Sequence, residues 1–163
     1  MSGKVTDNLG RASGLSKAVA GGAGKILQVV TGTSATEVSV TGTSYTDSGL
    51  DVAITPSASS SLIYVLAATG VYQAGGYAGY LSLFRDSTNL AGDNSPDHMN
   101  SMWASTNGNN VITPFCISFL DSPSSTSSIT YSLYAKAQTS GQATKVVASG
   151  PVSSIIAMEI DGS

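Results

Sequence analysis

The residues that could carry out chemistry in this chain are few and widely spaced. His98 is the only histidine and Cys116 the only cysteine, so one copy cannot supply a multi-histidine zinc site or an intrachain disulfide. A catalytic serine would have to work with His98, yet the chain contains no Gly-x-Ser-x-Gly turn to present such a nucleophile. The spacing of the carboxylates selects no pair, such as Asp86 with Asp93, for glycoside cleavage. The sequence therefore predicts a protein that is not an enzyme and needs no cofactor.

Residues 93–98 form the one cluster of hard metal ligands in the sequence. Asp93, Asn94 and Asp97 offer oxygen donors that suit calcium, but the spacing and the terminal glutamate of an EF-hand are missing. We therefore expect a solvated loop here rather than a metal site. A site formed where three copies meet is left open by the sequence.

The glycine-rich stretch Gly21–Lys25 resembles a phosphate-binding loop but lacks two residues that such a loop requires. Val19 stands where the first glycine of the pattern should be, and Ile26 stands where Ser or Thr should follow the lysine. The stretch also precedes a predicted strand rather than a helix. We interpret it as a hinge.

Tyrosines are concentrated in the glycine-rich segment 71–80. Tyr72, Tyr77 and Tyr80, with Gln73, could contact a receptor glycan or a protein partner through amphipathic rings that lose little entropy on binding. The alternative is a hairpin whose tyrosines pack on the sheet or on a neighbouring subunit. The pattern favours the hairpin. We call Tyr72, Gln73, Tyr77 and Tyr80 the candidate partner loop.

Charge divides the chain near residue 25. The first 25 residues carry Lys4, Arg11, Lys17 and Lys25 against Asp7, a net charge of +3, and the remainder carries a net charge of −6. Phosphate binding needs a dense basic face, so the sequence predicts no nucleic-acid partner. The chain has no signal-peptide pattern and no apolar stretch of membrane-spanning length, so we expect no membrane partner. We expect a soluble protein that is made in the cytoplasm.

Beyond residue 25, short apolar runs alternate with clusters of Gly, Pro, Asn and Ser, which is typical of an all-β sandwich. In Ile129–Gln138, every second residue from Ile129 to Ala137 is apolar, which indicates a strand with one buried face. Leu62–Thr69 is almost continuously apolar, which indicates a strand covered on both sides. The other strands are expected at 26–30, 36–40, 50–55, 80–85, 101–105, 111–120, 142–149 and 154–160.

The sequence thus predicts an extended, basic, glycine-rich attachment arm at residues 1–25 and a β-sandwich domain at residues 26–163. Cys116 lies in an apolar run, and we expect a buried, inert thiol. Only 10% of the residues are charged, so neighbouring copies would meet little repulsion, and the composition favours an oligomer.

Several segments resemble small virion proteins of tailed bacteriophages, a group loosely described as tail-fibre or capsid proteins. The resemblance covers most of the chain but not the loops 72–79 and 93–110. It implies a jelly-roll β-sandwich similar to the tumour-necrosis-factor-like head, assembled as a homotrimer. The segments that carry it are Gly3–Leu15, Gly24–Val30, Tyr45–Leu50 with Ile54–Pro56, and Ile155–Ile160.

Two virion roles follow from the resemblance. In the first, trimers decorate and cement the outside of the capsid, and the arm lies across the major capsid protein. In the second, the chain is the receptor-binding knob of a tail fibre, and its tyrosine-rich loop meets a host-surface glycan; a lectin-like module is a further alternative. We expect Tyr131, Leu133, Ile156 and Met158 near the core or the trimer axis. The arm residues expected to contact the capsid are Lys4, Val5, Leu9, Arg11, Leu15, Lys17 and Val19.

Overall fold

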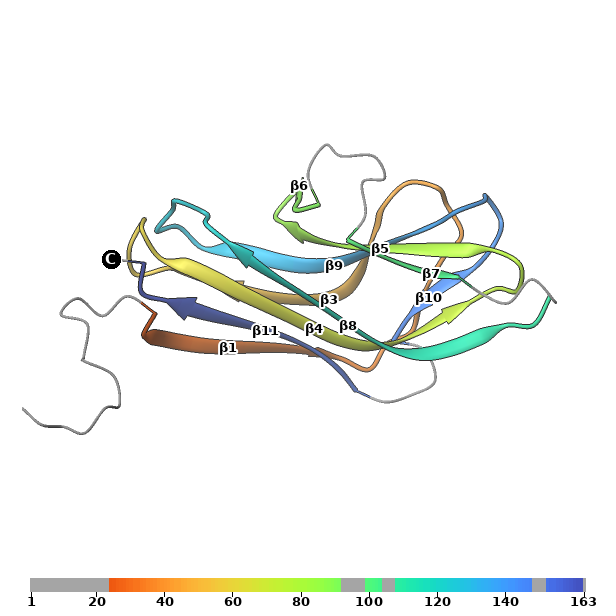
Figure 1. Ribbon diagram of the computed structural model, residues 1–163, viewed down its shortest axis with the longest axis horizontal. Helices are drawn as coiled ribbons and strands as arrows, with labels where there is room; N and C mark the ends of the chain where they lie inside the picture. The colour runs from red at the N-terminus through yellow and green to blue at the C-terminus, as the bar shows by residue number, and fades with distance from the viewer. Residues whose placement is uncertain (1–23, 92–98, 104–107, 148–151, 163) are drawn as a thin grey trace, which may run out of the picture.

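The computed structural model describes residues 24–91, 99–103, 108–147 and 152–162 of the chain (Figure 1). All regular structure in these ranges is β, and the strands form two antiparallel sheets. The strands are β1 (Ile26–Ser34), β2 (Val38–Val40), β3 (Thr46–Ile54), β4 (Leu62–Gln73), β5 (Ala78–Arg85), β6 (Thr88–Asn89), β7 (Asn100–Trp103), β8 (Val111–Asp121), β9 (Ile129–Ala137), β10 (Thr144–Val146) and β11 (Ser153–Ile160).

The first sheet, sheet A, is built around the long strand β4. β8 pairs with one edge of β4 along almost its whole length, whereas β11 and β10 share the other edge in succession. β1 continues the sheet beyond β11, and β2 continues it beyond β10. Sheet A is therefore four strands wide at both ends, with β8 along one side.

The second sheet, sheet B, has the order β3-β9-β5, with β6 and β7 both paired to the far edge of β5. The two sheets stack face to face in Figure 1, with β9 and β3 behind β4 and β11. The architecture is the all-β sandwich that the alternating sequence pattern predicts.

The pairings are nested, which defines a jelly-roll. β1 pairs with β11, β3 with β9 and β4 with β8, while the innermost strand β5 pairs with β6 and β7. Folding a long antiparallel hairpin over itself produces this order, and it places successive strand pairs in alternate sheets. The expected jelly-roll sandwich is confirmed; a trimer stays a prediction.

The core lies between the sheets and is formed by the inward residues of each alternating strand. The faces assigned to β9 are correct, because Tyr131 and Leu133 are fully buried. In β11, Ile155 and Ala157 point inward, while Ile156 and Met158 point outward. The four residues expected at the core or the trimer axis therefore divide into two core residues and two residues of the outer surface.

Three sequence expectations differ from the structure. Cys116 is exposed rather than buried, because it lies at an outward position between the inward-facing Phe115 and Ile117. In the described part of the expected strand 142–149, which ends at residue 147, only Thr144–Val146 form a strand, since β10 adds to β4 just where β11 has ended. The short strand β6 was not expected, because a two-residue pairing leaves no periodic pattern.

Candidate interaction surfaces

The exposed large hydrophobic side chains of the described strands all belong to sheet A, on its strands β1 and β8. Its strands are in register, so outward side chains from β1, β11, β4 and β8 align in rows across the sheet. We call the surface made by these rows the sheet-A face. The rows are Val29, Met158, Tyr64 and Leu120; then Thr31, Ile156, Leu66 and Ser118; then Thr33, Ser154, Ala68 and Cys116.

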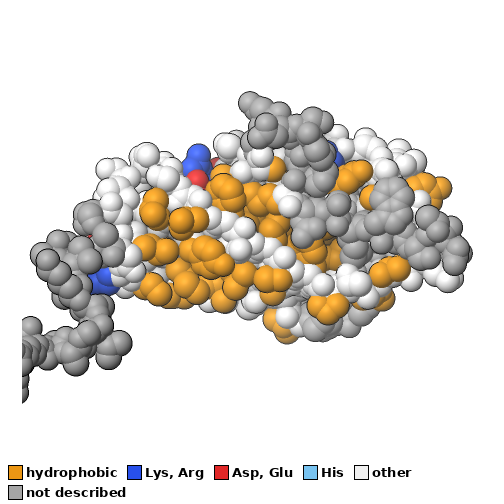
Figure 2. Space-filling view, viewed as in Figure 1, with side chains coloured by type: hydrophobic (Ala, Val, Ile, Leu, Met, Phe, Trp, Pro, Cys, Tyr) orange, Lys and Arg blue, Asp and Glu red, His pale blue; other side chains and the backbone are white. Residues whose placement is uncertain are grey.

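The sheet-A face contains no charged side chain in these three rows, and its apolar residues are accessible. Val29 is 53% exposed and Leu120 52%, and Ile112 further along β8 is 54% exposed. Figure 2 shows the hydrophobic side chains gathered over these strands. Single exposed apolar residues are common on monomers, but a contiguous patch of this kind marks an interaction surface.

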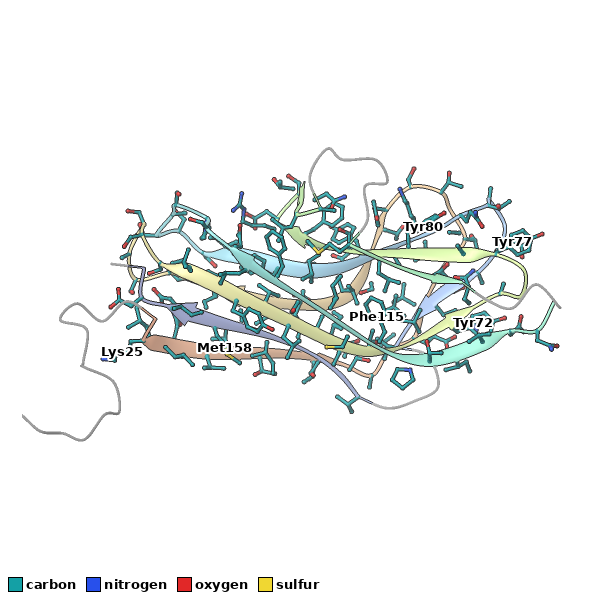
Figure 3. All side chains as sticks on the ribbon, in the orientation of Figure 1. Lys25, Tyr72, Tyr77, Tyr80, Phe115 and Met158 are labelled. Carbon is teal, nitrogen blue, oxygen red and sulfur yellow. The ribbon has the colours of Figure 1, made fainter. Side chains whose placement is uncertain are left out.

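The first and the last described segments of the chain lie side by side at one end of the sandwich. The Gly24 amide donates to the Asp161 carbonyl at 2.8 Å, and the Asp161 amide donates to the Lys25 carbonyl at 2.8 Å. The chain segment 1–23 therefore joins the sandwich beside the C-terminal strand β11. Lys25 lies at this end in Figure 3, far from the hairpin that carries Tyr77.

The buried carboxylate of Glu159 organises the same end. It accepts hydrogen bonds from the Ser57 amide at 2.7 Å, from the Ser57 and Ser61 hydroxyls at 2.6 and 2.7 Å, and from Gln28 Nε2 at 2.6 Å. Burial raises the pKa of Glu159, but these hydrogen bonds outweigh it and lower the pKa to about 2. The carboxylate has a structural role, because it ties β1 and the β3–β4 loop to β11.

The candidate partner loop is distributed over both sheets. Tyr72 and Gln73 belong to β4, Tyr80 belongs to β5, and Tyr77 lies in the connection between these strands. The Gln73 side chain is fully buried, and its Oε1 accepts a hydrogen bond from Thr144 Oγ1 at 2.6 Å. Tyr72 and Tyr80 lie in different layers, and Tyr77 lies at the tip of the molecule (Figure 3). These four side chains therefore do not line a common pocket.

Basic side chains of the body are engaged with nearby groups. Lys145 Nζ forms an ion pair with Glu37 at 2.8 Å and lies 5.0 Å from the centroid of the Tyr72 ring. This ion pair raises the pKa of Lys145. On the outer surface of sheet B, Lys136 lies 4.6 Å from the centroid of the Tyr45 ring. These cations are therefore held by neighbours in their own chain.

The remaining residues that the sequence predicts to be functional fall outside the described part of the chain. They are the arm residues and the possible metal ligands at positions 93–98, so the expectations about both stay predictions. Within the described ranges, no three His, Cys, Asp or Glu side chains gather as a metal site. Among those same residues, no helix is long and apolar enough to cross a membrane.

Sequence reasoning missed the role of Glu159 and the exposure of the sheet-A face. The alternation in β11 does place Glu159 on the same side as Ile155 and Ala157, and an acid on an inward face signals a buried hydrogen-bond network. The sheet-A face could have been predicted from the apolar residues that β11 and β4 carry at both their inward and their outward positions.

The class of protein that this geometry defines is a jelly-roll β-sandwich in which the outer face of one sheet has three central rows without a charged side chain. Comparison with solved structures finds structures of infectious bursal disease virus and of its VP2 subviral particle. The Gx strain structure is 17% identical, with a TM-score of 0.45 over 86% of this chain and 34% of that chain. The VP2 subviral particle is 16% identical, with a TM-score of 0.42 over 83% of this chain and 33% of that chain.

This chain therefore spans about a third of the length of those virus proteins. No protein-family profile matches the chain, and no curated protein matches it in sequence.

Proposed function

We propose that this protein is a structural component of a tailed-bacteriophage virion. Homotrimers of the sandwich decorate and cement the outside of the capsid, and the N-terminal arm, residues 1–25, attaches each copy to the major capsid protein. The observation that carries the proposal is the division of charge, because an arm of net charge +3 is joined to one end of a sandwich domain of net charge −6.

Several features support a structural rather than a catalytic role. Glu159, the most perturbed carboxylate described, has its oxygens occupied by donors from three side chains and a backbone amide. An arm that orders on a capsid loses about 1–2 kcal/mol of backbone entropy per residue, so it needs contacts along its whole length. Val5, Leu9, Leu15 and Val19 provide apolar contacts between the cations.

The receptor-binding knob is the second candidate, and the position of Tyr77 favours it. This side chain lies at the tip opposite to Lys25, as a receptor contact would on a fibre attached through the arm (Figure 3). Tyr77→Ala should then reduce adsorption of virions to host cells while the protein is still incorporated. Unchanged adsorption would contradict the receptor-binding role and leave capsid decoration as the only one of the two candidates.

The arm is tested in the full-length chain by replacing Lys4, Arg11 and Lys17 with alanine. The proposal predicts that this variant no longer binds capsids that lack the native protein, and that binding of the wild type weakens as salt rises. The matched control keeps the charges, with Lys4→Arg, Arg11→Lys and Lys17→Arg, and should still bind. Full capsid binding by the alanine variant would contradict the proposal.

A further inference from the structure

The central strand of sheet A is more apolar than its environment requires. Its outward residues Leu62, Tyr64 and Leu66 are only half-buried, and Ala68 is exposed. An antiparallel sheet that faces water normally alternates apolar and polar residues, whereas continuous apolar runs occur in strands covered on both sides. β4 thus has the sequence of a doubly covered strand, yet the described chain covers one side of it.

We propose that the sheet-A face packs against a second copy of this chain. The inference deepens the self-association contained in the proposed function, and it assigns the surface that mediates it. The remaining question is why another copy, and no other molecule, should cover the face.

Charge identifies the second copy as the occupant. Each sandwich domain carries a net charge of −6, so two copies repel through most of their surfaces. The three central rows of the sheet-A face contain no charge, and the ion pair between Lys145 and Glu37 near its end neutralises itself. An uncharged surface of aliphatic and hydroxyl side chains is complementary to itself.

The same charges disfavour two other occupants. The basic segment 1–23 of the same chain needs carboxylates for Lys4, Arg11 and Lys17, and the central rows of the sheet-A face provide none. A membrane surface would be met by a rim of Lys and Arg side chains. Around these rows, the described residues place Lys25, Lys145 and Arg85, and the last two are paired with Glu37 and Asp121.

The size of the face suits a stable contact between proteins. Four strands about 4.8 Å apart, and the 8 residues of β11 rising about 3.3 Å each, give the sheet-A face an area of roughly 19 by 26 Å. This is about 500 Å² on each copy, so two copies packed on this face bury about 1,000 Å² in total, which reaches the size expected of a specific interface. The face is therefore large enough to hold two copies together.

Cys116 offers a reporter within the face. Its exposed thiol lies in the third row, beside Ala68 of β4, and it is the only cysteine of the chain. A copy packed on the face covers this thiol. The rate at which a maleimide modifies Cys116 therefore measures coverage of the face in the wild-type protein, without any substitution.

The experiment combines sedimentation velocity with maleimide modification of the full-length protein at several concentrations. We expect an oligomer whose Cys116 reacts at least ~10-fold more slowly than in the dissociated, dilute protein. Val29→Glu with Leu120→Glu places like charges on the face at exposed positions, so it should give folded monomers with a rapidly modified thiol. The matched control, Thr46→Glu with Ala53→Glu, adds the same charges to exposed positions of β3 and should assemble like the wild type.

Three results would overturn the inference: a wild-type monomer at every concentration, an oligomer whose Cys116 reacts freely, or an oligomer that survives both face substitutions. A monomer whose Cys116 becomes reactive only when Lys4, Arg11 and Lys17 are replaced by alanine would instead identify the arm as the occupant. These measurements need no capsid. Failure of self-association is therefore distinguishable from failure of capsid attachment.

Discussion

Tyr131 donates a 2.6 Å hydrogen bond to Asp121 and so joins the two sheets across the interior. Tyr131 belongs to β9 of sheet B, whereas Asp121 is the last residue of β8 in sheet A. Arg85 of β5 adds contacts of 2.9 and 3.0 Å from Nη1 to the same carboxylate. Burial, followed by the hydrogen bond to Asp121, raises the pKa of Tyr131 far above its usual value, so the phenol stays protonated and continues to donate.

Tyr131→Phe should lower the free energy of unfolding by about 1–3 kcal/mol, because the Asp121 carboxylate loses a donor in a buried environment. Chemical denaturation at neutral pH measures the change. Tyr134→Phe is the matched control, since that ring stacks on Phe84 at 4.0 Å and keeps this contact without its hydroxyl. Equal destabilisation by the two substitutions would contradict a specific role for the bond between Tyr131 and Asp121.

Acid should destabilise the protein through Glu159. Its pKa is about 2 in the folded chain and 4.5 ordinarily, so its stabilising effect is complete above pH 4.5 and is lost as the pH falls towards 2. Glu159→Gln should reduce the free energy of unfolding at pH 7 and make it less dependent on pH between 4.5 and 2. Urea midpoints measured from pH 7 to pH 2 provide the test. A variant as stable as the wild type at pH 7 would show that the hydrogen bonds to Glu159 contribute nothing.

Gly32 should tolerate no side chain. A Cβ at this position of β1 would overlap the backbone carbonyl of Asp51 in β3, where the two sheets approach closely. Gly32→Ala should therefore destabilise the fold by at least about 2 kcal/mol. Gly42→Ala is the control, because nothing lies closer than 4.0 Å to its Cβ position and the substitution should be almost neutral. Thermal unfolding of both variants measures the difference.

The sequence predicted elements whose pattern is local. The alternation from Ile129 to Ala137 identified β9 and its buried face, because period-2 patterning depends only on neighbouring residues. Pairings depend on residues far apart in the chain. Glu159 is held by Gln28, Ser57 and Ser61, and no local signal connects a glutamate to these partners.

The candidate surfaces were predictable in composition but not in position. The apolar run of β4 indicated cover on both sides, yet only the register with β11 and β8 shows that its outward residues form one continuous face. The tyrosines of segment 71–80 looked like one loop in the sequence. A strand reversal between Tyr72 and Tyr80 separates them into different sheets, with Tyr77 alone in the connection between the strands.

The location of the protein on intact virions tests the central claim most directly. Electron microscopy of virions labelled with an antibody fragment against the sandwich domain reveals that location. We predict label distributed over the whole head, and loss of that label from virions in which Lys4, Arg11 and Lys17 are replaced by alanine. Label confined to the tail tip, or a fully labelled head in the substituted virions, would contradict attachment to the capsid through the arm.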